Sequence, residues 1–171
     1  MATKFVTGKV RFSFAFLNKS RTNDRGEEKF SVTVLAPKND PSFLKTFRAS
    51  EREAAVKKFP GKEEAFYKAI KSVLHDGDGL RPTGEAFGPE CKGCWVFTAS
   101  TDDRPGCIDE NLQPLMEPIK SGDYGRVSVN MYGFDTKGNR GVAAGLNNVQ
   151  LLERGESLGG RTDAATDFAE F

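Results

Sequence analysis

Residues 121–152, SGDYGRVSVNMYGFDTKGNRGVAAGLNNVQLL, carry the clearest structural pattern of the chain. Between residues 124 and 134 apolar and polar side chains alternate, which is typical of a strand with one buried face. The segment 135–141 predicts a turn, and residues 141–152 predict a partner strand whose small residues allow close backbone approach. The apolar face of the first strand holds Val127, Val129 and Met131, and the polar face holds Arg126, Ser128, Asn130 and Tyr132.

The amino-terminal part of the chain predicts a second hairpin. Residues 10–16, VRFSFAF, alternate so that the valine and the three phenylalanines share one face, and residues 29–34, KFSVTV, alternate in the same way. The polar stretch 18–28 between them is expected to be a loop. Strand alternation places Phe12, Phe14 and Phe30 inside the core.

Residues 36–75 change character and predict helices. Asp40 followed by Pro41 is a helix-start signal, and Ser50 with Glu53 matches a second one, the capping box. Either one helix runs through both points or two short helices meet there. A further helix is expected where apolar residues recur at helical spacing, namely Phe66, Ala69, Ile70, Val73 and Leu74.

A third strand is expected over residues 93–100, GCWVFTAS, after a glycine-rich and acidic loop over residues 76–92. Five strands with a helical insertion after the first two predict a mainly β fold, a five-stranded OB-fold barrel. Residues 1–161 are expected to form this one domain. Residues 162–171 are expected to be a flexible, disordered acidic tail.

The charge distribution is more informative than the total. The 171 residues carry a formal net charge of only +1, but residues 1–62 carry +8, residues 63–110 carry −5 and the last ten residues carry −3. A basic first third can contact phosphates while an acidic end competes with them. The low cysteine count, the lack of a long apolar run and a start without a signal-peptide pattern predict a cytoplasmic protein without a membrane span.

Catalytic and metal-binding patterns are weak, and we predict no enzyme, no cofactor and no metal. The single histidine, His75, lies in HDGDG, a surface-turn sequence without a nucleophile beside it. A Cys₃His zinc site built from Cys91, Cys94, Cys107 and His75 is the sharper alternative, but a second Cys-x-x-Cys pair is missing. Reduced thiols flanking the third strand are the simpler interpretation.

Nucleic-acid binding has better support, because single-strand binders combine cations for phosphates with aromatic faces for bases. The polar faces of the predicted strands offer both kinds of side chain. The direction of Trp95, which lies among alternating large residues, stays open. We expect phosphate contacts from Lys9, Arg11, Arg126 and Arg140, base stacking on Trp95, Tyr124 and Tyr132, and a hydrogen bond from Asn130.

The last ten residues form a separate signal. Three acids surround two phenylalanines, one of which is the final residue. Acidic tails of nucleic-acid-binding proteins can occupy the basic groove and carry an aromatic anchor to partner proteins. A tail that serves only solubility is the alternative. The candidate partner-binding residues are Asp163, Asp167, Phe168, Glu170 and Phe171.

Several segments resemble the OB-fold single-stranded DNA-binding proteins of tailed bacteriophages. They are VTGKVRFSFAF (6–16), RPGCIDENLQP (104–114), the long run 121–152 and GESLGGR (155–161). The resemblance implies a protein that coats exposed DNA, without sequence preference, during phage replication, recombination or repair in an infected bacterial cell. It also implies a carboxyl-terminal tail that restrains DNA binding and recruits replication or recombination proteins.

Other functions would use the same strands. A phage structural or protein-interaction β-barrel would share the fold without binding DNA, and a zinc-dependent module would lose its fold with a chelator. RNA binding is separated from DNA binding only by competition between oligonucleotides. A homodimer is compatible with the sequence, which does not give the oligomeric state.

Overall fold

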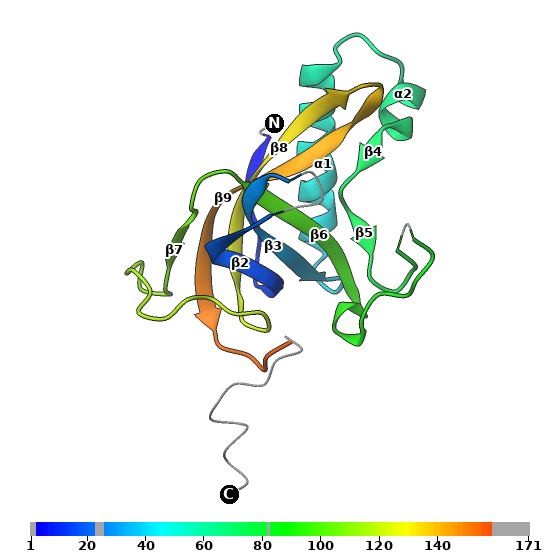
Figure 1. Ribbon diagram of the computed structural model, residues 1–171. Helices are drawn as coiled ribbons and strands as arrows, with labels where there is room; N and C mark the ends of the chain where they lie inside the picture. Colours follow the sequence, from blue (N-terminus) through cyan, green and yellow to red (C-terminus); the bar gives the residue numbers. More distant parts are fainter. Residues whose placement is uncertain (1–2, 23–25, 82, 159–171) are drawn as a thin grey trace, which may run out of the picture.

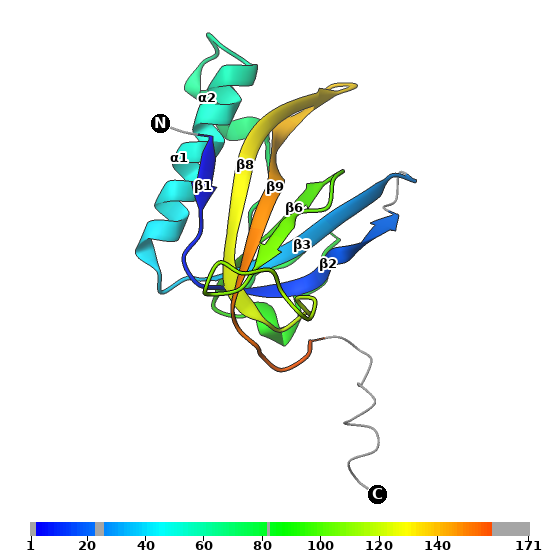
Figure 2. The same cartoon turned by 90° about the vertical axis from the view of Figure 1, so that its left-hand side faces the viewer.

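The computed structural model describes residues 3–22, 26–81 and 83–158. Figure 1 shows long, curved strands with one long helix packed against one side, and Figure 2 shows the same arrangement turned by 90°. The elements are β1 (Lys4–Val6), β2 (Val10–Thr22), β3 (Glu28–Pro37), α1 (Pro41–Lys58), α2 (Glu64–Ala69), β4 (Lys71–Ser72), β5 (His75–Asp76), the 3₁₀ helix η1 (Pro89–Cys91), β6 (Cys94–Thr101), β7 (Gly106–Ile108), β8 (Tyr124–Thr136) and β9 (Asn139–Glu153).

Five of these strands close into a ring. β2 pairs with β3, β3 with β6, β6 with β9 and β9 with β8, and β8 returns to β2. Every pairing in the ring is antiparallel except β6 with β9, which run parallel. The helices are inserted between β3 and β6. This is an OB-like arrangement, and the predicted mainly β fold with five principal strands and a helical insertion is confirmed.

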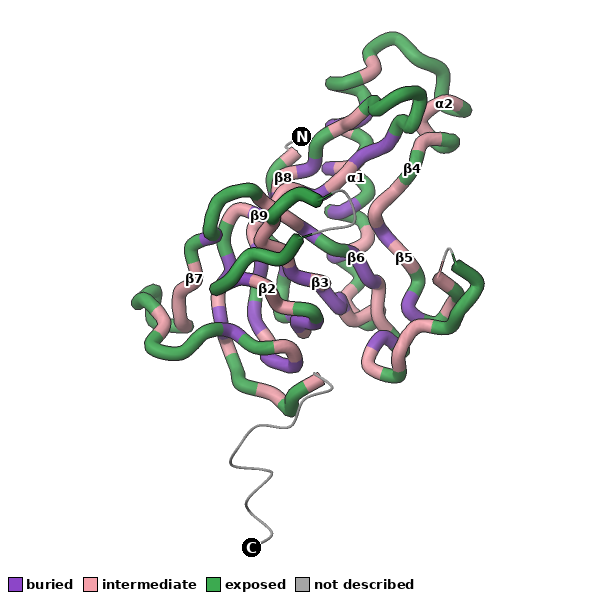
Figure 3. The backbone as a smooth tube through the Cα atoms, in the orientation of Figure 1, coloured by how far each residue is buried: buried purple, intermediate pink, exposed green. Residues whose placement is uncertain are grey.

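The hydrophobic core fills the ring and extends under α1. Figure 3 shows that burial is concentrated where the strands cross, while the far ends of the β2–β3 and β8–β9 hairpins are exposed. The ring of Phe97, from β6, lies 6.0 Å from Phe43 and 5.2 Å from Phe47 of α1, measured between centroids. Aromatic packing therefore attaches the helix to the barrel, and each fully buried phenylalanine contributes about 1.5–3 kcal/mol.

Helix α1 is one continuous helix from Pro41 to Lys58. Asp40 caps it as predicted, because its carboxylate accepts a hydrogen bond from the backbone nitrogen of Ser42 at 3.1 Å. The second start signal is not used. Ser50 is 4% exposed and lies inside the helix, on the face turned towards the core.

The predicted helix over residues 66–74 is wrong in its second half. α2 ends at Ala69, and Ile70 has extended backbone angles. Lys71 and Ser72 form β4, which pairs with Gly141 and Val142 of β9. The apolar residues of this segment are buried against different neighbours: Leu74 belongs to the core, while Phe66 packs on Phe59. Tertiary strand pairing overrides the helical periodicity here.

Strand β2 contains a bulge that the sequence pattern did not reveal. Ser13 pairs with Thr33 and Phe16 pairs with Ser31, so β2 has one residue more than β3 between these points. Phe14, in the bulge, has a φ of +46° and is 52% exposed. The extra residue reverses the alternation, so Leu17 points into the core and Phe14 and Phe16 do not. The predicted inward placement of Phe14 and Phe16 is therefore wrong. That of Phe12, which is fully buried, is confirmed, and Phe30 is half-buried.

The predicted loop over residues 18–28 is shorter than expected. β2 continues to Thr22 and β3 begins at Glu28, and the two arms still pair at Arg21 with Lys29. The polar composition of residues 18–28 suggested a loop. A two-stranded ribbon that projects into solvent has the same composition, because both of its faces contact water (Figure 2).

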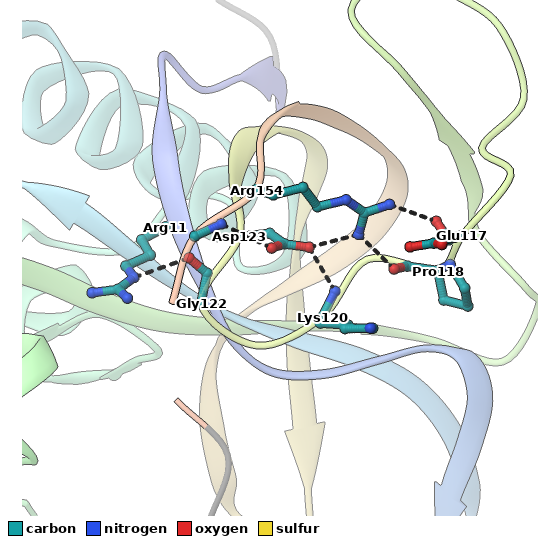
Figure 4. Close-up of polar contacts among 8 residues, drawn as sticks. Arg11, Glu117, Pro118, Lys120, Gly122, Asp123 and Arg154 are labelled. Atoms are coloured by element: carbon teal, nitrogen blue, oxygen red, sulfur yellow. Dashed lines mark hydrogen bonds and ion pairs between the residues drawn. The ribbon is translucent and has the colours of Figure 1, made fainter. Parts of the chain in front are cut away.

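A buried carboxylate attaches the segment after β9 to the barrel (Figure 4). Asp123 is 3% exposed and accepts hydrogen bonds from the backbone nitrogens of Lys120 and Gly155 at 2.9 and 3.1 Å. Its third partner is the guanidinium of Arg154, at 2.9 Å, which also donates to the carbonyls of Glu117 and Pro118. Every oxygen of the buried carboxylate is thus satisfied, as burial of a charge requires.

Within the described residues no helix is long and apolar enough to cross a membrane. The predicted tail, residues 162–171, lies outside the described residues, and so do its candidate partner-binding residues.

Gly125 is expected to be essential for closing the ring. A Cβ at this position would lie 1.9 Å from the carbonyl oxygen of Gln150 and 3.0 Å from the ring of Phe12. Gly125→Ala should therefore lower the free energy of unfolding by about 1–3 kcal/mol, measured by chemical denaturation. Gly79→Ala is the matched control, because its Cβ would meet nothing closer than 3.4 Å. Equal stability of the two variants would contradict this account of ring closure.

Candidate nucleic-acid interface

A groove of about 530 Å³ lies on the outer face of the barrel. The residues of its floor come from β2, β3 and β6, and those of one wall come from β5 and the loop that follows it. Figure 1 shows where these elements lie in the fold. The described lining residues include two arginines, Arg21 and Arg81, and one carboxylate, that of Glu90. The groove therefore has a positive balance and an open side, which suits an extended anionic ligand.

Aromatic rings line this groove from both sides. Phe14 and Phe16 come from β2, and Phe87 comes from the opposite wall. Each wall also carries a cation over a ring: the Arg21 guanidinium lies 5.0 Å from the centroid of Phe16, and that of Arg81 lies 4.9 Å from Phe87. Stacking faces combined with guanidinium groups are the components that single-strand binders use.

The floor between the aromatic walls is polar and uncharged. The hydroxyls of Thr33 and Thr98 lie 2.9 Å apart across β3 and β6, and Ser13 and Ser31 lie beside them. Hydroxyls both donate and accept hydrogen bonds, so this floor can contact any base or sugar without selecting one.

His75 stands at the edge of the groove, with its ring 6.1 Å from that of Phe87. Burial lowers the pKa of His75 below its ordinary value of 6.5, and the nearby charge of Arg81 lowers it further. The imidazole is therefore neutral at pH 7. It offers a flat aromatic face and a hydrogen-bonding nitrogen rather than a charge.

Three of the predicted contact residues gather at another point, where β2 meets β8. The Lys9 ammonium and the Arg11 guanidinium lie 5.4 and 5.2 Å from the ring centroid of Tyr124. Both cations already have partners: Lys9 pairs with Glu153 at 2.7 Å, and Arg11 donates to the carbonyls of Gly122 and Glu156. The two hydrogen bonds of Arg11 tie β2 to the segments before β8 and after β9, while the exposed pair with Glu153 balances the charge of Lys9.

The predicted polar face of β8 is confirmed as a face, but its members do not converge. Arg126 donates to the carbonyl of Thr7 at 2.8 Å, and Asn130 accepts a hydrogen bond from Thr3 at 3.1 Å. Tyr132 is 45% exposed. Arg140 lies on the β8–β9 hairpin, 3.5 Å from Asp135.

Trp95 points towards the interior rather than the groove. It pairs with Ala36 across β3 and β6 and packs against the main core. Lys38 covers its exposed side, 4.8 Å from the ring centroid. Ion pairs with Asp76 and Asp78 hold that lysine in place, and these hydrogen bonds raise its pKa.

The three cysteines are free thiols. Within the described residues, no group of three histidine, cysteine or acidic side chains is placed to hold a metal ion. Burial is the main factor that raises the pKa of Cys91, Cys94 and Cys107, so these thiols are protonated at pH 7.

Sequence reasoning missed the groove residues for two separate reasons. Phe14 and Phe16 were placed on the apolar face of the strand because residues 13–16, SFAF, contain no sequence feature that indicates a bulge. Arg81 and Phe87 lie in a segment without periodicity, and long-range contacts place that segment beside the barrel: β5 pairs with β6, and Phe87 packs against the cluster of Leu35 and Val96. The available signal was an aromatic residue and an arginine within a glycine-rich loop.

An OB-like ring with an aromatic, cation-bearing outer face belongs to the oligonucleotide-binding class of this fold. Residues 3–171 match the family model described as Enterobacter phage Enc34, ssDNA-binding protein. The chain belongs to this family, which confirms the predicted resemblance to phage single-stranded DNA-binding proteins. The family is non-enzymatic, as expected. No curated protein matches the chain at a significant level.

Solved structures share the fold. The single-stranded DNA-binding protein from bacteriophage Enc34 in complex with ssDNA has a TM-score of 0.76 at 24% identity, over 92% of this chain and 90% of that one. Another structure of the Enc34 protein has a TM-score of 0.74 at 25% identity, over 99% and 90% of the two chains. Bacteriophage T7 gp2.5, also a single-stranded DNA-binding protein, has a TM-score of 0.57 at 16% identity, over 96% and 93%.

The position of His75 in the groove wall can be checked directly, because it is the only histidine. A pH titration followed by NMR should give a pKa below 6.5. Arg81→Gln should raise this pKa part of the way back, since burial, the larger cause, remains. Lys92→Gln, which also removes one cation from an exposed site, should leave it unchanged. An Arg81 variant with the wild-type histidine pKa would contradict the described wall.

Proposed function

We propose that this protein binds single-stranded DNA without sequence preference and protects it during phage replication, recombination or repair. The observation that carries the proposal is the groove, in which exposed aromatic faces and two arginines line a polar, uncharged floor. Family membership and the ssDNA complex of the Enc34 protein support it. Affinity comes from stacking and phosphate contacts, neither of which reads the base sequence.

In this proposal the groove takes over the stacking role first expected of Trp95. Bases stack on Phe14, Phe16 and Phe87, while Arg21 and Arg81 neutralise phosphates. The other candidate residues lie around the groove rather than in it. We assign Lys9, Arg11 and Tyr124 to one end of the DNA path, Tyr132 and Arg140 to the other, and Arg126 and Asn130 to the outer face of β8.

Phe14 offers a test that separates binding from folding. Its positive φ is costly for a residue with a side chain, so Phe14→Gly relieves strain while it removes a stacking face. The variant should keep its unfolding free energy within about 1 kcal/mol of the wild type. It should lose roughly 1–3 kcal/mol of affinity for oligo-dT, measured by fluorescence anisotropy at two salt concentrations.

Leu112→Gly is the matched control for this test. Leu112 also has a positive φ, of 64°, and is 68% exposed, but it lies in the loop after β7, away from the groove. The Leu112→Gly variant should bind oligo-dT with the same affinity as the wild type. Wild-type protein that shows no saturable binding would overturn the proposed function, and binding that does not weaken with salt would overturn its electrostatic part.

We further propose that the acidic tail competes with DNA and carries an anchor for replication or recombination proteins. Residues 162–171 contain three acids and no basic residue. Deleting them removes a net charge of −3 and should tighten binding to oligo-dT, most strongly at low salt. The 171-residue chain with Asp163, Asp167 and Glu170 changed to Asn, Asn and Gln should show the same gain. Unchanged or weaker binding in both variants would remove the tail as a competitor.

A further inference from the structure

A second aromatic and cationic surface lies where α2 meets the β8–β9 hairpin. We call it the α2 platform and define it by Phe66, Lys62, Lys71 and Arg140. The ammonium of Lys62 lies 5.5 Å, and the guanidinium of Arg140 5.9 Å, from the ring centroid of Phe66. Phe66, Lys71 and Arg140 line a shallow pocket of about 320 Å³. The platform thus repeats the ring-and-cation arrangement of the groove at a separate place.

The charges of the platform have little to do with holding the fold. Neither Lys62 nor Lys71 forms an ion pair with any residue in the described part of the chain. Lys71 only donates a hydrogen bond to Asn139, and Arg140 meets Asp135 at 3.5 Å with both side chains exposed. Exposed pairs of this kind are worth little. The platform therefore keeps a positive charge that a polyanion can use.

The platform is continuous with the groove through one short extended segment. Lys71, in β4, lines the platform pocket, while Val73 and His75 line the groove. At about 3.3 Å per residue, the four steps from Lys71 to His75 span about 13 Å. Figure 1 shows this segment running from α2 through β4 to β5. Single-stranded DNA that leaves the groove beside His75 would need only a few nucleotides to reach the platform.

We infer that single-stranded DNA continues from the groove along β4 and ends on the α2 platform, where a base stacks on Phe66 and phosphates meet Lys71 and Arg140. This inference rests on the proposed function and adds the path of the DNA beyond the groove. The platform lengthens the stretch of DNA that one protein molecule covers. It has no role for oligonucleotides short enough to fit the groove alone.

The test is a length series of labelled oligo-dT, from about 4 to about 16 nucleotides, the range of OB-fold site sizes. The variant Lys71→Gln with Arg140→Gln should bind the shortest binding-competent oligonucleotides like the wild type. It should lose the extra affinity that the wild type gains with length. For long oligonucleotides, the slope of log affinity against log salt should fall by about two, one for each lost cation.

Two further variants separate a local effect from a general loss of charge. Lys45→Gln with Lys120→Gln removes the same charge from exposed sites elsewhere and should keep the length dependence. Phe66→Leu keeps apolar packing against Phe59 but removes the aromatic face. This variant should bind long oligonucleotides more weakly, with the same slope of log affinity against log salt as the wild type.

The outcomes distinguish this inference from the proposed function. If the platform variant behaves like the control variant at every length, the DNA does not reach the platform and the inference fails while groove binding stands. If the platform variant loses affinity equally for short and long oligonucleotides, the platform is not a separate extension and the inference also fails. If the wild type binds none of the oligonucleotides, the proposed function itself fails.

Discussion

The architecture depends on a very short contact, the two residue pairs through which β8 returns to β2. Val10 pairs with Gly125 and Arg11 pairs with Tyr124, and these pairs turn an open sheet into a ring. The contact is possible because Gly125 lets the backbone of β9 and the ring of Phe12 approach. Around it, Arg11 donates to the carbonyls of Gly122 and Glu156. Closure fixes the direction in which β2 leaves the barrel, and with it the position of the groove.

The groove follows from what happens further along the same strand. One extra residue in β2 moves two phenylalanines from the inside of the barrel to its outer face. The cost is a phenylalanine held at a positive φ with half of its surface in water. A buried ring, or a glycine at this position, would be more favourable for stability alone. Strain combined with an exposed apolar face at one residue is a feature typical of functional sites.

Much of the barrel could be predicted from local patterns, whereas the groove could not. The alternation in β8 and the cap at Asp40 depend on neighbouring residues, so sequence alone placed them correctly. The helix predicted through Leu74 failed because pairing with β9, more than sixty residues away, decides the conformation of Lys71 and Ser72. Contact residues were predicted on polar strand faces, and the structure shows that two of them, Arg126 and Asn130, also form hydrogen bonds with the amino-terminal segment. The bulge and the wall containing Arg81 and Phe87 depend on long-range packing.

The attachment of residues 154–158 has a consequence for whatever follows them. Asp123 holds Arg154 and Gly155, and Leu158 packs beside Leu35 and Val96. The chain therefore leaves the barrel from a fixed origin rather than from a loose end. A segment joined at such an origin can extend at most about 3.5 Å per residue from it. A ligand tethered in this way has an effective concentration set by geometry, so its occupancy does not depend on how much protein the cell contains.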